Sequence, residues 1–345
     1  MLQFQCDYTE GGHPKILEAL QKTNLEQTPG YGTDGYCEKA RAKVRAACGQ
    51  PDADVHFLVG GTQANATVIA SILKPYQGVV CAGPGHIAVH ETGAVEATGH
   101  KVLTLPAADG IITARQVEDL CRAHFQSPIR EHEVQPGMVY ISWPTECGAL
   151  FSKAQLEALR RVCDAYGLPL YLDGARLGYG LGSPQCDLTL ADIARLCDAF
   201  YIGGTKCGAL FGEAVVITNQ AYQKDFRYMM KRQGGMLAKG RLLGLQFDTL
   251  LTDGLYLRVC REAVEKALAI REAFAGRGVP LWMDSYTNQQ FPILAQAQME
   301  FLSGQGYQYE VWGPAEGGRS ITRFCTSWAT TPESVERLIG DIQKL

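Results

Sequence analysis

The stretch LPLYLDGARLGYG, residues 168–180, runs an apolar segment directly into a carboxylate. The residues from Leu168 to Leu172 predict a buried strand, Asp173 follows at once, and Arg176 lies three residues further on. An ionised side chain is costly to bury without a partner, so a carboxylate at this place needs a reason. Because ligands bind beyond the carboxyl ends of the strands in open α/β sheets, we expect a ligand at Asp173.

The composition indicates an ordinary globular protein. The 345 residues are 46% hydrophobic and carry a formal net charge of −4, which gives no reason to expect nucleic acid or an anionic membrane as a partner. The longest apolar runs, residues 54–60 and 138–143, are far short of a membrane span, and the first residues lack the apolar core of a signal peptide. The twelve cysteines include no CxxC pair, which favours reduced thiols and a cytoplasmic location.

Strands and helices alternate over the first 250 residues. The strands are apolar on both faces, which is typical of a parallel-rich sheet covered by helices, so we predict an α/β fold. The glycine-rich segment GYGLG, residues 178–182, is expected to be a loop because no apolar helical segment follows it directly. The predicted strands cover residues 54–61, 78–83, 100–106, 137–143, 168–174 and 198–204, and the predicted helices cover 14–22, 36–48, 62–74, 113–124 and 153–166.

The pattern changes near residue 250. A long helical segment, residues 255–275, leads into short strand and helix pieces and a final helix at 332–344. We therefore predict a large α/β domain with its N-terminal arm, residues 1–250, and a smaller C-terminal α+β domain, residues 251–345.

Glycines follow the first predicted strand of the sheet. Gly60, Gly61 and Thr62 lead directly into a helix, where free backbone N–H groups and the positive end of the helix dipole favour a phosphate. Taken alone, the segment also fits a plain turn capped by Thr62, since the spacings of a Walker loop and of GxGxxG are both absent.

A lysine follows the last predicted strand, in GGTKCG, residues 203–208. Desolvation there would lower the pKa of Lys206 and free its amine as a nucleophile, although a lone lysine is usually a surface residue. A phosphate cradle, a strand-end aspartate and a strand-end lysine are together what pyridoxal 5′-phosphate (PLP) needs. Lys206 would hold the cofactor aldehyde as a Schiff base, Thr205 would join the cofactor-binding residues, and Asp173 would keep the pyridine nitrogen protonated.

The same motifs resemble a known family. In this order, they are similar to the low-specificity L-threonine aldolases of the β-eliminating lyase group, which are fold-type I PLP enzymes. The resemblance implies a mostly parallel seven-stranded sheet, a small C-terminal domain, and a homotetramer of dimers with active sites at the dimer interface. The matching stretches are CDYTE (6–10), YGTDGY (31–36), GGTQAN (60–65), GHIAVHETGA (85–94), LDGAR (172–176), GGTK (203–206) and KRQGGM (231–236).

The resemblance also implies roles for single residues. His86 would stack on the face of the pyridine ring, Arg176 would contact the cofactor oxygen and the substrate carboxylate, and Tyr31 would reach the neighbouring subunit's site. Arg323 matches an arginine of the small domain that binds the same carboxylate, with Arg319 as the alternative match. His90, four residues after His86, suggests a zinc pair, but no third ligand follows, so we expect no metal.

Four positions depart from the family pattern. Gly60 stands where the phosphate loop of the family often begins with a serine. Cys6 stands where the family has a carboxylate-binding serine, and Glu146 stands where it has a histidine near the substrate hydroxyl. Leu237 stands where it has an arginine that contacts the phosphate of the next subunit, and Lys239 or Arg232 would have to substitute. These departures bear on the substrate more than on the cofactor.

The predicted function is a PLP-dependent aldolase that cleaves L-threonine or L-allo-threonine to glycine and an aldehyde. The base that removes the β-hydroxyl proton would be Glu146, His86 or a water between them, and the apolar neighbour Trp143 would suit Glu146 to this role by raising its pKa. Three alternatives stay open: another PLP reaction (β-elimination, racemisation or transamination), a dinucleotide- or nucleotide-sugar-binding protein, and a non-catalytic PLP-binding protein.

Overall fold

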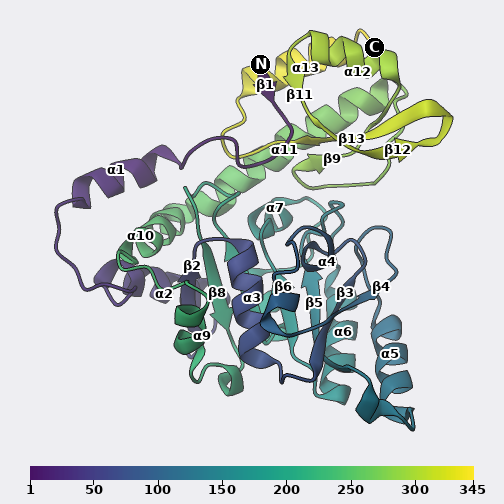
Figure 1. Ribbon diagram of the computed structural model, residues 1–345. Helices are drawn as coiled ribbons and strands as arrows, with labels where there is room; N and C mark the ends of the chain where they lie inside the picture. The colour runs from purple at the N-terminus through teal and green to yellow at the C-terminus, as the bar shows by residue number, and fades with distance from the viewer.

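A seven-stranded sheet forms the centre of the computed structural model, which describes residues 1–345 (Figure 1). The strand order is β2–β8–β7–β6–β5–β3–β4, and only β8 is antiparallel to its neighbours. The predicted α/β class with a mostly parallel seven-stranded sheet is thus confirmed, although the sequence patterns alone missed β8. The strands are β2 (Asp54–Leu58), β3 (Gln77–Ala82), β4 (Val102–Leu105), β5 (Gln135–Ser142), β6 (Leu170–Asp173), β7 (Ala199–Gly203) and β8 (Glu213–Ile217).

The strands are apolar on both faces because each face packs on its own layer of helices. In β5, Val139 and Ile141 point into one core while Met138 and Tyr140 point into the other. The second core contains α3 (Gly61–Ile72) and α9 (Phe226–Arg232). The first, larger core contains α2 (Gly35–Cys48), α5 (Ala114–Gln126), α6 (Lys153–Tyr166), α8 (Leu190–Leu196) and α10 (Arg241–Leu250).

The glycine-rich segment after β6 is a helix, α7 (Leu177–Gly182), so the prediction of a loop there was wrong. Its glycines serve close packing rather than flexibility. A Cβ on Gly178 would lie 2.5 Å from the sulfur of Cys260, and a Cβ on Gly180 would lie 2.6 Å from the Trp143 ring. The missing side chains therefore let α7 lie against α11 (Leu255–Gly276) and the indole of Trp143.

The C-terminal part of the chain contains a small antiparallel sheet and an apolar core of its own. The first strand of the chain, β1 (Leu2–Gln3), pairs in parallel with β11 (Tyr307–Gln308), so the N-terminal arm lies beside the C-terminal elements (Figure 1). The division into two domains at residue 250 stays a prediction. The remaining elements here are β9 (Gln289–Gln290), β10 (Ile293–Leu294), β12 (Glu310–Ala315), β13 (Arg319–Cys325), α12 (Gln296–Gly304) and α13 (Pro332–Ile342).

The other two α-helices are short. Helix α1 (Pro14–Thr23) packs against α10, and α4 (His86–Val89) follows β3. None of the helices combines the length and the apolar character that crossing a membrane requires.

Candidate active site

A cleft lies at the edge of the sheet where β2, β5, β6 and β7 end. Its inner cavity has a volume of about 310 Å³, and an adjoining outer cavity has a volume of about 280 Å³. The two cavities share the lining residues Tyr8, His86, Glu146, Arg176 and Lys206. The sheet topology explains the gathering, because parallel strands end at the same edge. The predicted residues that line the inner cavity are Gly60, Gly61, Thr62, His86, Glu146, Asp173, Arg176, Thr205 and Lys206, and Arg323 lines the outer one.

Asp173 is buried and accepts four hydrogen bonds. They come from the hydroxyls of Tyr140 (2.7 Å) and Tyr201, from the amide of Asn65 (2.9 Å) and from the backbone N–H of Ala175 (3.0 Å). Burial alone would raise the pKa of this carboxyl, but the positive charge on His86 and these donors outweigh it and hold the pKa below its usual value. The side chain is therefore an anion fixed at the end of β6, as a partner for a pyridine N–H must be.

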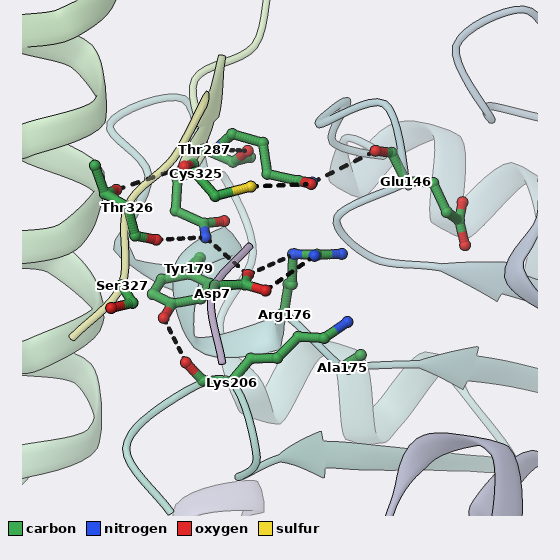
Figure 2. A network of polar contacts seen from close by, with 12 residues as sticks. Asp7, Glu146, Ala175, Arg176, Tyr179, Lys206, Thr287, Cys325, Thr326 and Ser327 are labelled. Atoms are coloured by element: carbon green, nitrogen blue, oxygen red, sulfur yellow. Dashed lines mark hydrogen bonds and ion pairs between the residues drawn. The ribbon is translucent and has the colours of Figure 1, made fainter. Parts of the chain in front are cut away.

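The amine of Lys206 extends into the cleft without a hydrogen bond or an ion pair to the protein. The centroid of the Tyr8 ring lies 5.9 Å from the nitrogen. Burial and the positive charge of Arg176 lower the pKa of Lys206, against the negative charges of Asp7 and Asp173. Its backbone, in contrast, is fixed, because the Tyr179 hydroxyl donates to its carbonyl oxygen (Figure 2). The structure thus presents a nucleophilic amine on a rigid support.

The glycine segment has the features of an anion site. The N-cap of α3 is Gly60, with no side-chain cap, so the first amides of this helix are left for a ligand and the alternative of a plain turn capped by Thr62 does not apply. A Cβ on Gly61 would lie 2.8 Å from the Tyr201 hydroxyl, so a larger residue there would disturb the hydrogen bond from Tyr201 to Asp173. The uncapped amides, the anionic Asp173 and the free Lys206 amine together fit PLP.

Arg176 already has a carboxylate partner. Its Nε and Nη2 atoms donate to the two oxygens of Asp7 at 2.7 and 3.0 Å (Figure 2). The side-chain amide of Asn288 donates to the same carboxylate at 2.9 Å. Both members of the pair are buried. Burial raises the pKa of Asp7, but the guanidinium outweighs it and brings the pKa down to about 2. Only Nη1 of Arg176 is left without a protein partner, so the predicted contact with a ligand would use that nitrogen.

Arg323 lies on the other side of the cleft, on β13. It forms an ion pair with Glu310, donates to the carbonyl of Gln5 at 3.1 Å and lies over the ring of Trp312 at 4.8 Å. Its Nε atom is buried without a partner. Glu310 and Trp312 line the same cavity, so an incoming carboxylate would compete with Glu310 for this guanidinium.

His86 is oriented by a buried carboxylate. Its Nδ1 lies 2.7 Å from Glu91, and Glu91 also accepts from Asn65, which in turn donates to Asp173. Burial lowers the pKa of His86. The hydrogen bond to Glu91 and the negative charge of Asp173 raise it and outweigh burial, so the pKa lies above its usual value. The ring of His90 is 5.5 Å away, and no three histidine, cysteine or acidic side chains gather in a metal-binding arrangement.

Glu146 is buried under the cleft and uses one oxygen for structure. Its Oε1 accepts from the backbone N–H of His86 at 2.8 Å and from the Ser142 hydroxyl at 2.6 Å. Burial raises the pKa of Glu146, although the hydrogen bond from Ser142 lowers it in part. The second oxygen, Oε2, has no protein partner and is the one available to a substrate.

Two predicted residues do not line the cleft of their own chain. Cys6 lines neither cavity, although its neighbours reach the site: the carbonyl of Gln5 accepts from Arg323, Asp7 pairs with Arg176, and Tyr8 lines both cavities. Tyr31 is 47% exposed and lines a separate cavity together with Leu237. Its N–H donates to the carbonyl of Ala238, so the two segments expected to serve a neighbouring subunit lie side by side.

Several site residues were missed in the sequence. Asp7, Asn65 and Glu91 lie within stretches that resemble the family, and their acidic or amide side chains were the available signal. Glu213 and Glu310 belong to strands whose register the sequence pattern does not reveal.

Comparisons with known proteins agree with this geometry. Residues 3–297 match the family model described as β-eliminating lyase. A low-specificity L-threonine aldolase of a Pseudomonas species is 30% identical, over 99% of this chain and 97% of that protein. The threonine aldolase of Leishmania major superimposes with a TM-score of 0.97 at 41% identity, covering 100% of this chain and 99% of that one.

A more distant structure shares the fold alone. Serine palmitoyltransferase from S. paucimobilis, solved with PLP bound together with myriocin, has a TM-score of 0.68 at 14% identity, covering 99% of this chain and 86% of that one. Full-length matches to threonine aldolases and a cleft whose donors fit PLP lead to one conclusion. The chain belongs to the β-eliminating lyase family and is a PLP-dependent lyase of fold type I.

Proposed function

We propose that this protein cleaves β-hydroxy-α-amino acids such as L-threonine and L-allo-threonine into glycine and an aldehyde. One observation carries the proposal: the unpartnered amine of Lys206 lies in the same cleft as the anionic Asp173 and the two arginines Arg176 and Arg323. A lysine for the cofactor aldehyde, an anion for its ring nitrogen and cations for a substrate carboxylate are the parts that such a reaction needs.

The cofactor, when bound, supplies an electron-accepting ring conjugated with the α-carbon of the substrate. Lys206 would attach it covalently, Asp173 would keep its nitrogen protonated, and the amides of Gly61 and Thr62 would bind its phosphate. The ring of His86, held by Glu91, would lie over the pyridine. These roles follow the family resemblance and agree with the positions of the side chains in the cleft.

The arginines would set the direction of bond cleavage. Arg323, with Nη1 of Arg176, would hold the substrate carboxylate so that the Cα–Cβ bond stands perpendicular to the cofactor ring. Arg323 would carry most of this binding, because the charge of Arg176 is already balanced by Asp7. Glu310 would have to release Arg323 first.

Glu146 is the proposed base. Its unpartnered Oε2 would take the proton of the β-hydroxyl while the Cα–Cβ bond breaks, and the electron pair left at Cα would then take up a proton to give glycine. The raised pKa of Glu146 brings its basicity closer to neutral pH, which suits proton transfer. The backbone N–H of His86 donates to the other oxygen of Glu146. His86 would therefore position Glu146 and would not itself be the base.

The proposal includes an assembly and a location. We propose a homotetramer of dimers in which Tyr31 reaches the neighbouring subunit's site, since this tyrosine is exposed and away from its own cleft. Beside it lie Lys231, whose amine is 5.0 Å from the Tyr31 ring, and Arg227. We also propose a cytoplasmic location, since all twelve cysteines are free thiols.

Product analysis tests the proposal. PLP-loaded protein is incubated with L-threonine and with L-allo-threonine, and glycine and acetaldehyde are measured together. We expect equal amounts of both products, and none from the Lys206→Ala variant. Formation of 2-oxobutyrate and ammonia without glycine would assign β-elimination instead, and inversion at Cα without cleavage would assign racemisation.

A further inference from the structure

A buried glutamate lies in the part of the cleft that is expected to bind phosphate. Glu213 is the first residue of β8 and is only 3% exposed, yet it lines the same cavity as Gly60, Gly61 and Thr62. An acid is unexpected here, because a phosphate ester is close to a dianion at neutral pH. None of the roles assigned above uses it.

The antiparallel direction of β8 explains the position. Its neighbours β2 and β7 end at the cleft, so β8 begins there, and Glu213 pairs with Leu58 on one side and Gly203 on the other. Leu58 is two residues before Gly60, and Gly203 is three before Lys206. The carboxyl therefore lies between the glycine segment and the lysine loop.

The hydrogen bonds of Glu213 tie it to that loop. Its Oε2 accepts from the N–H of Gly204 at 3.0 Å, and its Oε1 accepts from the hydroxyl of Thr205 at 2.8 Å. The same hydroxyl accepts from the N–H of Gly212 at 3.0 Å. If the Glu213 carboxyl is protonated, it and the Thr205 hydroxyl each carry one O–H group. One of these two O–H groups forms the hydrogen bond between the two side chains. The other is then free to donate into the cavity.

The charge of Glu213 is set by its surroundings. Burial raises its pKa to about 8, against the hydrogen bonds from Thr205 and Gly204 and the charge of Lys206. Lys206 and Asp173 are the charged groups that face it. The tyrosines that face it, Tyr171, Tyr201 and Tyr256, stay neutral in this range because burial raises each pKa well above its usual value.

We propose that Glu213 is a phosphate ligand that acts in its protonated form, donating to the cofactor phosphate directly or through the Thr205 hydroxyl. Once ionised, it repels the phosphate and weakens cofactor binding. A bound phosphate favours the neutral acid, so binding takes up a proton in the alkaline range. The inference rests on the cofactor of the proposed function, and it adds a pH limit to cofactor retention that the lysine bond alone does not predict.

The test measures binding of pyridoxamine 5′-phosphate by tryptophan fluorescence between pH 6.5 and 9.5. This compound keeps the phosphate but has no aldehyde to react with Lys206. Glu213→Gln is the matched variant, because an amide is neutral at every pH, accepts from Gly204 and donates to Thr205, whose hydroxyl is then free for the phosphate. Glu310→Gln removes an acid from the outer part of the same cleft and is the control for charge.

At pH 7 we expect wild type and Glu213→Gln to bind with similar dissociation constants. Above about pH 8 the dissociation constant of the wild type should rise, relative to the variant, by up to about tenfold per pH unit, because one proton is linked to binding. Glu310→Gln should follow the wild type. If the dissociation constants of wild type and Glu213→Gln change with pH in the same way up to pH 9.5, the proposal is overturned. Weaker binding by the variant at every pH would also overturn it, because that result indicates a purely structural role.

A second comparison needs no variant. Pyridoxamine lacks the phosphate, so its binding to the wild type should not show the additional alkaline loss, and the same loss with pyridoxamine would contradict a phosphate contact. The two hypotheses also fail in different ways. If neither compound bound at any pH, the proposed function would fall and the inference with it, whereas binding without an effect of Glu213 would remove the inference alone.

Discussion

The pair of Asp7 and Arg176 gives the sharpest prediction for stability. Asp7 is fully buried, and its carboxylate takes two hydrogen bonds from the guanidinium and one from Asn288. Asp7→Asn keeps the size of the side chain but removes the negative charge. The guanidinium of Arg176, itself buried, then lacks a counter-charge in a part of the protein that water hardly reaches.

The expected loss follows from two estimates. The pKa of Asp7 falls from 3.8 to about 2 on folding, and this difference corresponds to roughly 2 kcal/mol of stabilisation at neutral pH. Removing one member of a buried pair costs about 3–5 kcal/mol in general. Because the asparagine retains part of the hydrogen bonding, we expect a loss of about 2–4 kcal/mol.

Urea unfolding of the cofactor-free proteins, followed by circular dichroism at one fixed protein concentration, measures this loss. The folded pKa is depressed, so the stabilisation is fully present above pH 4 and is lost as the pH falls toward 2. The difference between wild type and Asp7→Asn should therefore be constant from pH 7 to about 4.5 and shrink below that.

The control is a more exposed pair of the same residue types, Arg271 and Asp284, in which the arginine side chain is 22% and the aspartate side chain 70% exposed. Asp284→Asn should cost less than about 1 kcal/mol. Equal losses for the two variants, or a loss below about 1 kcal/mol for Asp7→Asn, would refute the view that the buried pair holds the N-terminal arm on the site.

Three further variants test the cleft. Glu146→Gln should lower kcat for L-threonine by about 10²- to 10⁴-fold and remove the acid limb of the pH profile, and an unchanged kcat would discard it as the base. Glu310→Gln should lower KM by about two- to fivefold with little change in kcat, because it frees Arg323; a raised KM would contradict that competition. Glu91→Gln should lower the pKa of His86 in an NMR titration, and a pKa that stays raised would mean that Glu91 does not orient the ring.

The sequence predicted the elements whose signals are local. The helix at 153–166 was predicted with its bounds, because Ser152 forms a capping box at its start and Gly167 adopts a left-handed conformation at its end. The grouping of the glycine segment, Asp173 and Lys206 was also predictable, since each follows a strand of a parallel sheet and such strands end at one edge.

The remaining features depend on contacts between distant segments. Asp7 and Arg176 are 169 positions apart, and no local pattern pairs them. Glu213 reaches the cleft only because β8 runs antiparallel, so that its first residue lies where its neighbours end. The same holds for Gly178. A glycine in a sequence indicates a turn, but this one lies in a helix, where α11 packs too closely to leave room for a side chain.

The residue that binds the cofactor covalently can be identified directly. The protein is loaded with PLP, reduced with borohydride and digested, and the peptides are analysed by mass spectrometry. We expect one modified residue, Lys206, in the peptide that contains GGTK, with no modification in Lys206→Ala. Stable modification of another lysine, or none at all in a folded protein that was given PLP, would contradict the assignment of this cleft as the active site.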